Sequence, residues 1–485
     1  RWVSITLVVG AFVLLVFQLV SYSRMRSNFP PGTTIAGVPV GGLDQARAAE
    51  RLMLAYSVPV EVRYGEAVIQ IKPSALGFQL DIETMVTAAD QERVQQPFWQ
   101  GFWEYLWNRL PGGKEIPLRA TISQERVREY LTSEISARYD IPPESPVPVA
   151  GGVSFSPGKP GSVLDVERAV TLIEDALRSP KSRVVNLTVN SVKPGKPSLQ
   201  NLQILIQQVI DTAGFDGLTE VYLMDLESGE ELSFAYGNKQ VYPPNISFSA
   251  ASTIKIPIMV SVFRKYSEPT PATISQMMEL MIERSENDPS DQLMKAGLDV
   301  NLGPLYLTDD MRALGLDNTF MAGYFAPGSP LLNRYETAGN KRQDVETNPD
   351  EYNQTTPVDM GILMKDIYQC AQTGGGTFAV VFPDQISQAE CATMISYLTK
   401  NRIGVLIEAG IPDGTQIAHK HGWSIEPADG LIHTIGDVAI VFTPGGKYIL
   451  SVFMYHPNQL IWDPANKLMA QISRVIYNYF NMSPR

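Results

Sequence analysis

The first residues of the chain are apolar on every face. Residues 2–20 contain no charged side chain, and roughly 19 residues is the length of a helix that crosses a bilayer. The run ends at Tyr22, Ser23 and Arg24 without the small-residue pattern of a cleavage site. An uncleaved anchor over residues 1–24 is therefore predicted in preference to a removed signal peptide. A buried core helix is the weakest alternative for a segment that is apolar all round.

One pattern of turn and apolar residues then occurs twice. Pro73, Gly77, Leu80, Asp81, Ile82, Glu83 and Val86 recur at a constant offset as Pro157, Gly161, Leu164, Asp165, Val166, Glu167 and Val170. Each copy predicts a strand, a turn, an aspartate N-cap and an amphipathic helix. Two small α+β modules are expected, over residues 27–118 and 119–197, with a linker at 194–197. An aromatic-rich segment over 98–107 predicts either a membrane-surface contact or packing against the modules.

The pattern changes after residue 198. It predicts helices over 199–213, 252–266 and 465–480, and strands over 218–226, 232–236, 416–424, 437–443 and 447–455. This order predicts a domain over 198–485 in which an antiparallel sheet is flanked by helices and joined to an all-helical lobe. The expected fold class is thus multidomain α/β with an N-terminal transmembrane helix.

Length, charge and cysteine content narrow the classes of function. A chain of 485 residues is too long for one core, so two or three domains are expected. The formal net charge of −12 argues against a nucleic-acid partner. Cys370 and Cys391 lack metal-site spacing and are compatible with a disulfide or with two buried thiols. None of the four histidines forms a zinc pattern, so no metal or other cofactor is expected.

Three short motifs occur in a fixed order in the C-terminal half. They are S-x-x-K from Ser252 to Lys255, S-x-N from Ser285 to Asn287, and K-x-G from Lys420 to Gly422. A serine at a helix start lies at the positive end of the helix dipole. A lysine three residues later shares its face and can take its proton, which makes Ser252 a candidate nucleophile. A second S-x-x-K, at Ser156, contains proline and glycine, makes a poor helix start and is set aside.

This ordered set resembles that of class A β-lactamases and other penicillin-recognising serine hydrolases. The resemblance implies that Ser285 relays a proton to the leaving nitrogen and that Asn287 contacts a substrate amide. It implies that Lys420 stabilises Ser285 and a substrate carboxylate. It also implies an oxyanion hole built from the backbone N–H groups of Ser252 and Trp423.

Two positions depart from the family pattern. Glu286 replaces the usual aspartate in the second motif. His421 stands where a hydroxyl normally binds the substrate carboxylate, which puts the identity of the substrate in doubt. Gly422 keeps the family's small residue, which lets the backbone approach a ligand.

A deacylating glutamate is harder to assign. Class A β-lactamases carry a glutamate and an asparagine four residues apart, before a T-T-P helix start. Thr355, Thr356 and Pro357 match that helix start, and upstream Glu336 and Asn340 have the spacing. Glu336 is therefore the candidate base. Glu346 is a rival, but no asparagine lies four residues after it.

The region over residues 27–197 is similar to the peptidoglycan-binding domain of VanW- and YoaR-like cell-envelope proteins. The similarity rests on Pro31 and Gly32 with Gly37, Gly41 and Gly42, and on the repeated proline, glycine and Leu-Asp block. It implies cell-wall peptidoglycan as a partner. The alternative is a stalk that holds the catalytic domain off the membrane.

Together these patterns predict a single-pass, membrane-anchored serine hydrolase of the class A β-lactamase type, held by residues 2–20. It would open β-lactams or peptidoglycan stem-peptide amides through an acyl-enzyme on Ser252. A D,D-peptidase-like penicillin-binding protein and a peptidoglycan-binding scaffold with weak catalysis are the alternatives. Two arginines follow the anchor and one precedes it, which by charge alone favours the inside for the bulk of the chain. The extracytoplasmic placement rests on the chemistry.

Overall fold

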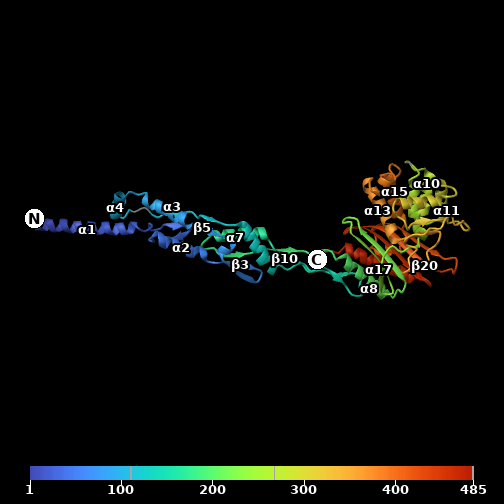
Figure 1. Ribbon diagram of the computed structural model, residues 1–485, viewed down its shortest axis with the longest axis horizontal. Coiled ribbons are helices and arrows are strands. Elements are labelled where there is room, and N and C mark those ends of the chain that lie inside the picture. Colours follow the sequence, from blue (N-terminus) through green and yellow to red (C-terminus); the bar gives the residue numbers. More distant parts are fainter. Residues whose placement is uncertain (110–111, 267, 483–485) are drawn as a thin grey trace. The chain divides into compact units, whose positions relative to one another are not determined.

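The computed structural model describes residues 1–109, 112–266 and 268–482, and the chain divides into two compact units (Figure 1). The N-terminal unit comprises Arg1–Glu144 and Lys159–Pro194, and the C-terminal unit comprises Ser145–Gly158 and Gly195–Arg485. Each has its own core of buried apolar side chains.

The N-terminal unit begins with helix α1, Trp2–Arg26. Within the described ranges it is the one helix long and apolar enough to cross a membrane, and none of its most apolar 18-residue window is buried. This bears out the expected apolar N-terminal helix, which by length and composition fits a signal anchor or a signal peptide.

Three helices of this unit begin at an aspartate. They are α2 (Gln45–Ser57), α3 (Ile82–Val94) and α7 (Val166–Arg178). The carboxylates of Asp44, Asp81 and Asp165 accept hydrogen bonds from backbone N–H groups three residues on, at 2.8, 3.1 and 3.2 Å. The N-caps predicted at Asp81 and Asp165 are therefore confirmed, and each of the three carboxylates satisfies a backbone donor that its helix leaves free.

The two sequence repeats share one core. Strand β3 (Val60–Tyr64) pairs antiparallel with β4 (Ala67–Ile71) in the first copy and parallel with β11 (Val184–Asn186) in the second. The other strands of the unit are β1 (Thr34–Ile35), β2 (Val38–Pro39), β5 (Gln79–Leu80), β6 (Glu115–Ile116), β7 (Ala120–Thr121), β10 (Gly161–Leu164) and β12 (Val189–Val192). The remaining helical elements are η1 (Pro73–Leu76), α4 (Phe98–Leu106), α5 (Gln124–Tyr130), η2 (Leu131–Ser136) and α6 (Ala137–Tyr139).

A hairpin inside the second predicted module belongs to the C-terminal unit. Strands β8 (Val147–Pro148) and β9 (Phe155–Ser156) pair antiparallel, and Phe155 is buried in the C-terminal core against Tyr479. The Asn478 side-chain amide donates to the Val153 carbonyl at 2.7 Å. The repeat pattern hides this excursion because the same proline and glycine signals fit a turn in either unit.

The C-terminal unit is built on a six-stranded antiparallel sheet in the order β15-β14-β13-β21-β20-β19. The strands are β13 (Leu218–Asp225), β14 (Glu231–Gly237), β15 (Gln240–Tyr242), β19 (Gln416–Ile425), β20 (Ile432–Thr443) and β21 (Gly446–Tyr455). Every residue of β13 is buried, because helices cover both faces of the sheet. This confirms the predicted antiparallel sheet with flanking helices.

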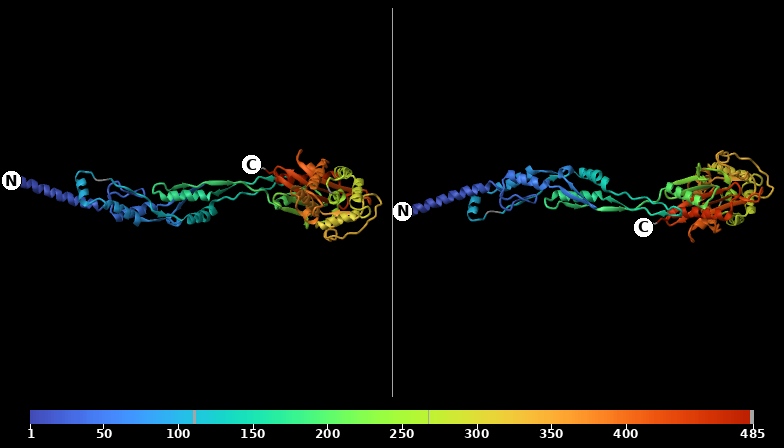
Figure 2. Two further views of the ribbon diagram at one scale, coloured as in Figure 1. Left: turned by 90° about the horizontal axis from the view of Figure 1, so that it is seen from above. Right: turned by 90° about the horizontal axis from the view of Figure 1, so that it is seen from below.

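Helices α8 (Leu199–Ala213) and α17 (Trp462–Phe480) pack together on one face of the sheet, and helix α13 (Pro357–Thr373) crosses the other (Figure 1). The lobe beyond α13 contains α9 (Lys255–Phe263), α10 (Ala272–Glu283), α11 (Asn287–Gly297), α12 (Gly303–Ala313), α14 (Thr377–Val381) and α15 (Gln388–Lys400). Helix α16 (Ile407–Gly410) packs instead against α17. A small sheet joins β16 (Phe248–Ser249), β18 (Asn353–Thr355) and β17 (Phe320–Met321). Figure 2 shows the sheet and this lobe from two further sides.

The two cysteines form a disulfide between α13 and α15. The bond joins Cys370 to Cys391, with their Cα atoms 5.9 Å apart. Of the two states that the sequence left open, the structure therefore has the bonded one.

Candidate active site

The three sequence motifs meet where the lobe touches the edge of the sheet. Ser252 lies in the 3-10 turn η3 (Ala251–Ile254), which continues into α9. The turn is entered through Ala251, whose φ of 47° is in the left-handed region that a residue with a Cβ seldom adopts. The Thr253 hydroxyl donates to the Ala250 carbonyl at 2.7 Å and helps to hold the turn. Ser252 itself remains partly exposed.

Lys255 lies one helical turn after Ser252 and is fully buried. Its Nζ is 2.9 Å from Ser252 Oγ, 2.8 Å from Asn287 Oδ1 and 2.6 Å from the Ser285 carbonyl, and Ser285 Oγ lies at 3.3 Å. Burial, followed by the nearby charge of Lys420, lowers the pKa of Lys255 to about 7. The amine can therefore lose its proton near neutral pH while it stays within hydrogen-bond reach of the Ser252 hydroxyl.

Ser285 lies between α10 and α11 with φ at 61°, again in the left-handed region. A non-glycine residue in this conformation is strained, and such strain persists only where the surroundings hold it. Two lysines do so here: Lys420 Nζ donates to Ser285 Oγ at 3.0 Å and Lys255 Nζ donates to the Ser285 carbonyl. Glu286 and Asn287 follow, and the exposed Glu286 side chain marks where the motif departs from the family's usual aspartate.

Lys420 reaches the cluster from β19, the edge strand of the sheet. It is fully buried, and burial lowers its pKa to about 7, with Asp437 on the neighbouring strand opposing the shift. Asp437 is itself buried and accepts hydrogen bonds from His419 Nδ1 at 3.0 Å and from the Ile407 N–H at 3.2 Å. No sequence pattern marks His419 and Asp437 as neighbours of this lysine, because the pairing of β19 with β20 brings them together.

Gly422 lies where β19 approaches the turn that carries Ser252. A Cβ at this position would lie 2.9 Å from the Ser252 nitrogen, 2.9 Å from the Thr253 nitrogen and 2.8 Å from the Ala250 carbonyl. Only glycine fits this approach. Trp423 follows directly on the same strand.

His421 occupies the strand position between Lys420 and Gly422, and its ring is packed. It stacks on Trp423 with ring centroids 4.7 Å apart, and its Nδ1 lies 3.3 Å from the Asn401 side-chain nitrogen. Only 7% of the residue is exposed, and burial lowers the pKa of His421 far below its usual value. The imidazole is therefore neutral, and it can offer a substrate carboxylate a hydrogen bond but no charge.

Glu336 is not brought into the cluster. Its side chain is 74% exposed and forms an ion pair with Lys341. Among the described residues no carboxylate forms a hydrogen bond with Ser252 or Lys255. Asn340, the partner expected from its spacing, donates instead to the Tyr335 carbonyl and the Gln354 side chain. Residues four apart lie on one face only if they belong to a helix, and the segment from Glu336 to Asn340 is not helical.

An aromatic ring lies next to the Lys255 amine. The ring centroid of Phe325 lies 5.2 Å from Lys255 Nζ. The buried carboxylate of Asp291 on α11 accepts hydrogen bonds from the Phe325 and Ala326 N–H groups at 2.9 Å each, which fixes this loop. Loop and ring border a groove that is also lined by Ser249, Asp350 and Ser424. No sequence motif marks Phe325 or Asp291, so the analysis of the sequence did not find them.

The C-terminal unit identifies the family. Residues 201–270 and 265–480, more than half of the chain, match the family described as "Beta-lactamase enzyme family", so the chain belongs to it. Residues 69–186 match the domain described as "Putative peptidoglycan binding domain".

The chain is also similar to solved structures. PBP-A is 24% identical to this chain, and the match covers 60% of this chain and 100% of the PBP-A chain, with a TM-score of 0.42. A PBP-A mutant in acyl-enzyme complex with penicillin G is also 24% identical, with the same coverage of both chains and a TM-score of 0.41. A β-lactamase from Streptosporangium roseum is 18% identical over 57% of this chain and 97% of its own, with a TM-score of 0.40. No curated protein sequence matches the chain.

Proposed function

We propose that this protein is a serine acyl-transfer enzyme that acts on β-lactams and on peptidoglycan stem-peptide amides. The observation that carries the proposal is the contact of Lys255 Nζ with Ser252 Oγ at 2.9 Å, within a buried set of polar groups whose lysines have lowered pKa values. A structural lysine would be expected to pair with a carboxylate, whereas this one faces hydroxyl and amide oxygens.

The proposed reaction forms an acyl-enzyme. Neutral Lys255 takes the Ser252 Oγ proton as the oxygen attacks the carbonyl carbon, and the developing oxyanion is held by the N–H groups of Ser252 and Trp423. Ser285 then donates its proton to the leaving nitrogen as the C–N bond breaks, and Lys420 supplies a proton to the Ser285 oxygen in turn. The proton taken from Ser252 stays on Lys255. Asn287 would hold the substrate amide, with Lys420 and neutral His421 near its carboxylate.

We infer that deacylation by water is slow. An aromatic ring from Phe325, rather than a carboxylate, adjoins Lys255, and Glu336 lies on the surface with Lys341. Water near the ester would therefore lack a dedicated base, and acylation would outpace hydrolysis. This favours the D,D-peptidase-like alternative, in which an amine or water resolves the adduct slowly, over rapid β-lactam turnover.

Intact-mass spectrometry of the full chain in detergent, followed after addition of benzylpenicillin, tests both steps. We expect one penicilloyl adduct on Ser252, which forms faster than it is hydrolysed and therefore accumulates. The Ser252→Ala chain should form no adduct. An adduct that forms and disappears with steady turnover would instead support a β-lactamase. If the folded chain gains no mass, the nucleophile assignment fails and the peptidoglycan-binding scaffold becomes the better description.

We further propose that α1 anchors the chain in the cell membrane, that both units lie outside the cytoplasm, and that the N-terminal unit binds peptidoglycan. Support comes from the length and apolarity of α1 and from the domain match over residues 69–186. A disulfide between buried cysteines also fits an oxidising compartment. Sedimentation of the chain with purified peptidoglycan, with Ser252→Ala as a catalysis-free form, tests the binding.

A further inference from the structure

Helix α4, Phe98–Leu106, has three distinct faces. One face is packed into the N-terminal unit and includes the buried Gly101 and Phe102. A second is polar and carries Gln100 and Glu104. The third is an exposed aromatic stripe of Trp99, Trp103 and, just after the helix, Trp107, which are 69%, 63% and 61% exposed. Large apolar side chains on one stripe of a surface helix indicate a binding face.

The packed face of α4 is fixed to the last turns of α1. Tyr22 of α1 contacts the rings of Phe98, Phe102 and Tyr105 at centroid distances of 5.3, 5.6 and 5.3 Å. A Cβ on Gly101 would lie 2.1 Å from the Tyr22 hydroxyl, so glycine is required for this approach.

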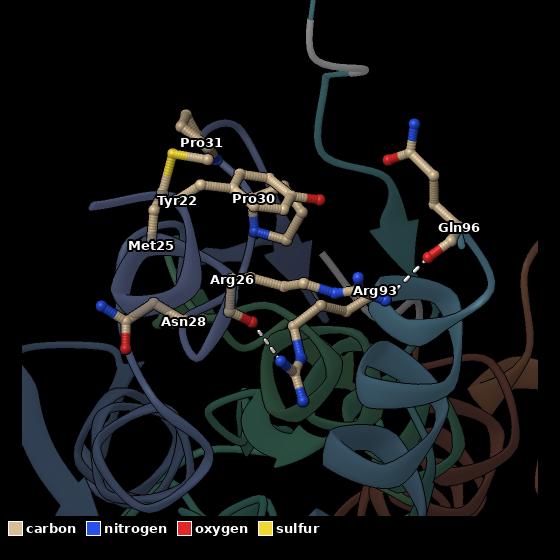
Figure 3. Close-up of a pocket in the computed structure, with 8 residues that line it drawn as sticks. All are labelled: Tyr22, Met25, Arg26, Asn28, Pro30, Pro31, Arg93 and Gln96. Atoms are coloured by element: carbon tan, nitrogen blue, oxygen red, sulfur yellow. Dashed lines mark hydrogen bonds between the residues drawn. The ribbon is translucent and has the colours of Figure 1, made fainter. Parts of the chain in front are cut away.

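Polar contacts join the end of α1 to α3 and to the segment just before α4, and Figure 3 shows them. The Arg26 guanidinium donates to the Gln96 carbonyl at 2.7 Å, and Arg93 donates to the Arg26 carbonyl. Arg26 also lies over the Phe98 ring, 5.2 Å from its centroid. These contacts hold α4 at a defined position next to the end of the apolar helix.

The direction of α4 matters as much as its position. In Figures 1 and 2, α4 lies across the axis of α1, next to its C-terminal end. If α1 spans a bilayer, a helix that crosses its axis at this end runs along the bilayer surface. Tryptophan is enriched at that depth, since its ring is apolar and its N–H finds a partner among the headgroups.

We propose that α4 is a membrane-surface helix whose tryptophan stripe inserts into the headgroup and acyl boundary of the lipid bilayer. The proposal rests on the proposed membrane crossing of α1. Lipid is the occupant because the helix that carries the stripe packs beside the end of α1, none of whose most apolar window is covered by protein. The exposed Arg24 adds a positive charge at the same level, which suits anionic headgroups.

Quenching of tryptophan emission by brominated lipids tests the proposal in the full chain reconstituted into phosphatidylcholine and phosphatidylglycerol vesicles. Trp2→Phe removes the indole of α1 and leaves Trp99, Trp103 and Trp107 with two tryptophans of the C-terminal unit. We expect lipids brominated near the headgroup to quench this chain strongly. The same chain with the three α4 tryptophans also changed to phenylalanine should lose that quenching and keep its fold, because the three rings are exposed.

The converse chain keeps Trp2 and has phenylalanine at the three α4 positions. Compared with the chain that also lacks Trp2, which has the same two tryptophans of the C-terminal unit, it reports on α1. Quenching of Trp2 without quenching of the α4 tryptophans would overturn the α4 proposal while α1 still inserts, and quenching of neither would overturn both. Blue-shifted α4 emission that bromine does not quench would indicate a protein partner and also overturn it. A nitroxide spin label attached at Trp103→Cys should collide more often with oxygen, which is enriched in the bilayer, than with a water-soluble nickel reagent. A label attached at Gln100→Cys, on the polar face, should collide more often with the nickel reagent.

Discussion

Two lysines surround one serine hydroxyl at the residue scale. Ser285 Oγ lies 3.0 Å from Lys420 Nζ and 3.3 Å from Lys255 Nζ, and both lysines are fully buried. Burial disfavours each ammonium, and Lys420 further disfavours that of Lys255. Because both pKa values are lowered to about 7, both amines change their protonation state near neutral pH.

The rate of acylation should therefore depend on pH in both directions. As pH rises through about 7, Lys255 becomes the neutral base and the rate should increase. Lys420 loses its charge in the same range, which weakens its support of Ser285, so the rate should reach a maximum near pH 7 and decline above it. Single-turnover acylation by benzylpenicillin between pH 5.5 and 9 measures this profile, and a flat profile would contradict the role of Lys255 as base.

Gly422→Ala should abolish efficient acylation without unfolding the chain. The new Cβ would lie 2.9 Å from the Ser252 nitrogen and displace the backbone that frames the oxyanion site. Loss of one oxyanion donor costs about 10²–10³-fold in rate, and we expect a decrease of at least that order. Gly195→Ala, where no atom lies within 4 Å of the added Cβ, is the matched control. An unchanged acylation rate in Gly422→Ala, with a normal unfolding temperature, would contradict the site geometry.

At the scale of elements, the disulfide joins two lobe helices that also pack on each other. Cys370 of α13 and Cys391 of α15 are 21 residues apart and buried, and α13 rests directly on the sheet. Closing a loop of this size stabilises a fold mainly by restricting its unfolded chain.

Reduction of this bond should lower the free energy of unfolding of the C-terminal unit by about 2–4 kcal/mol. The double variant Cys370→Ala and Cys391→Ala should match the reduced chain, since alanine leaves no buried polar atom behind. Urea unfolding of the oxidised, reduced and double-variant chains measures the difference. Equal midpoints in all three would show that the bond contributes nothing to stability.

At the scale of the whole molecule, the chain enters the C-terminal core earlier than its repeats suggest. Residues 145–158 form the hairpin of β8 and β9, which places Phe155 against Tyr479 and gives Asn478 a backbone partner at Val153. Residues 159–194 then return to the N-terminal unit, so the second sequence repeat contributes to both cores.

Phe155→Ala should destabilise the C-terminal unit, although position 155 precedes the start of α8. Removal of a buried phenylalanine costs about 3–5 kcal/mol, and we expect the lower end because the hairpin can relax. Thermal unfolding of the full chain, with loss of penicilloyl-adduct formation as the marker for the C-terminal unit, measures the effect. Val147→Ala, which changes an exposed side chain of the same hairpin, is the control. A larger shift in Val147→Ala than in Phe155→Ala would contradict this account.

The sequence by itself determined the features that depend on neighbours along the chain. Aspartate caps at 81 and 165, the apolar helix α1 and the strands of the large sheet follow from local apolar patterns and hydrogen-bonding capacity. The ordered motifs also indicated Ser252, Lys255 and Lys420, because their chemistry is carried by residue type and spacing.

Tertiary structure alone decided the features that depend on what lies across the fold. The Glu336 spacing was satisfied in sequence, yet an irregular segment carries its side chain to the surface. Phe325 lies next to Lys255 because the Asp291 carboxylate, on α11, accepts a hydrogen bond from the backbone N–H of Phe325 and holds its loop there. The tryptophan stripe on α4 lies beside the end of α1 because Tyr22, far away in sequence, packs against Phe102. Contacts of this kind are set by packing between segments, and no local pattern encodes them.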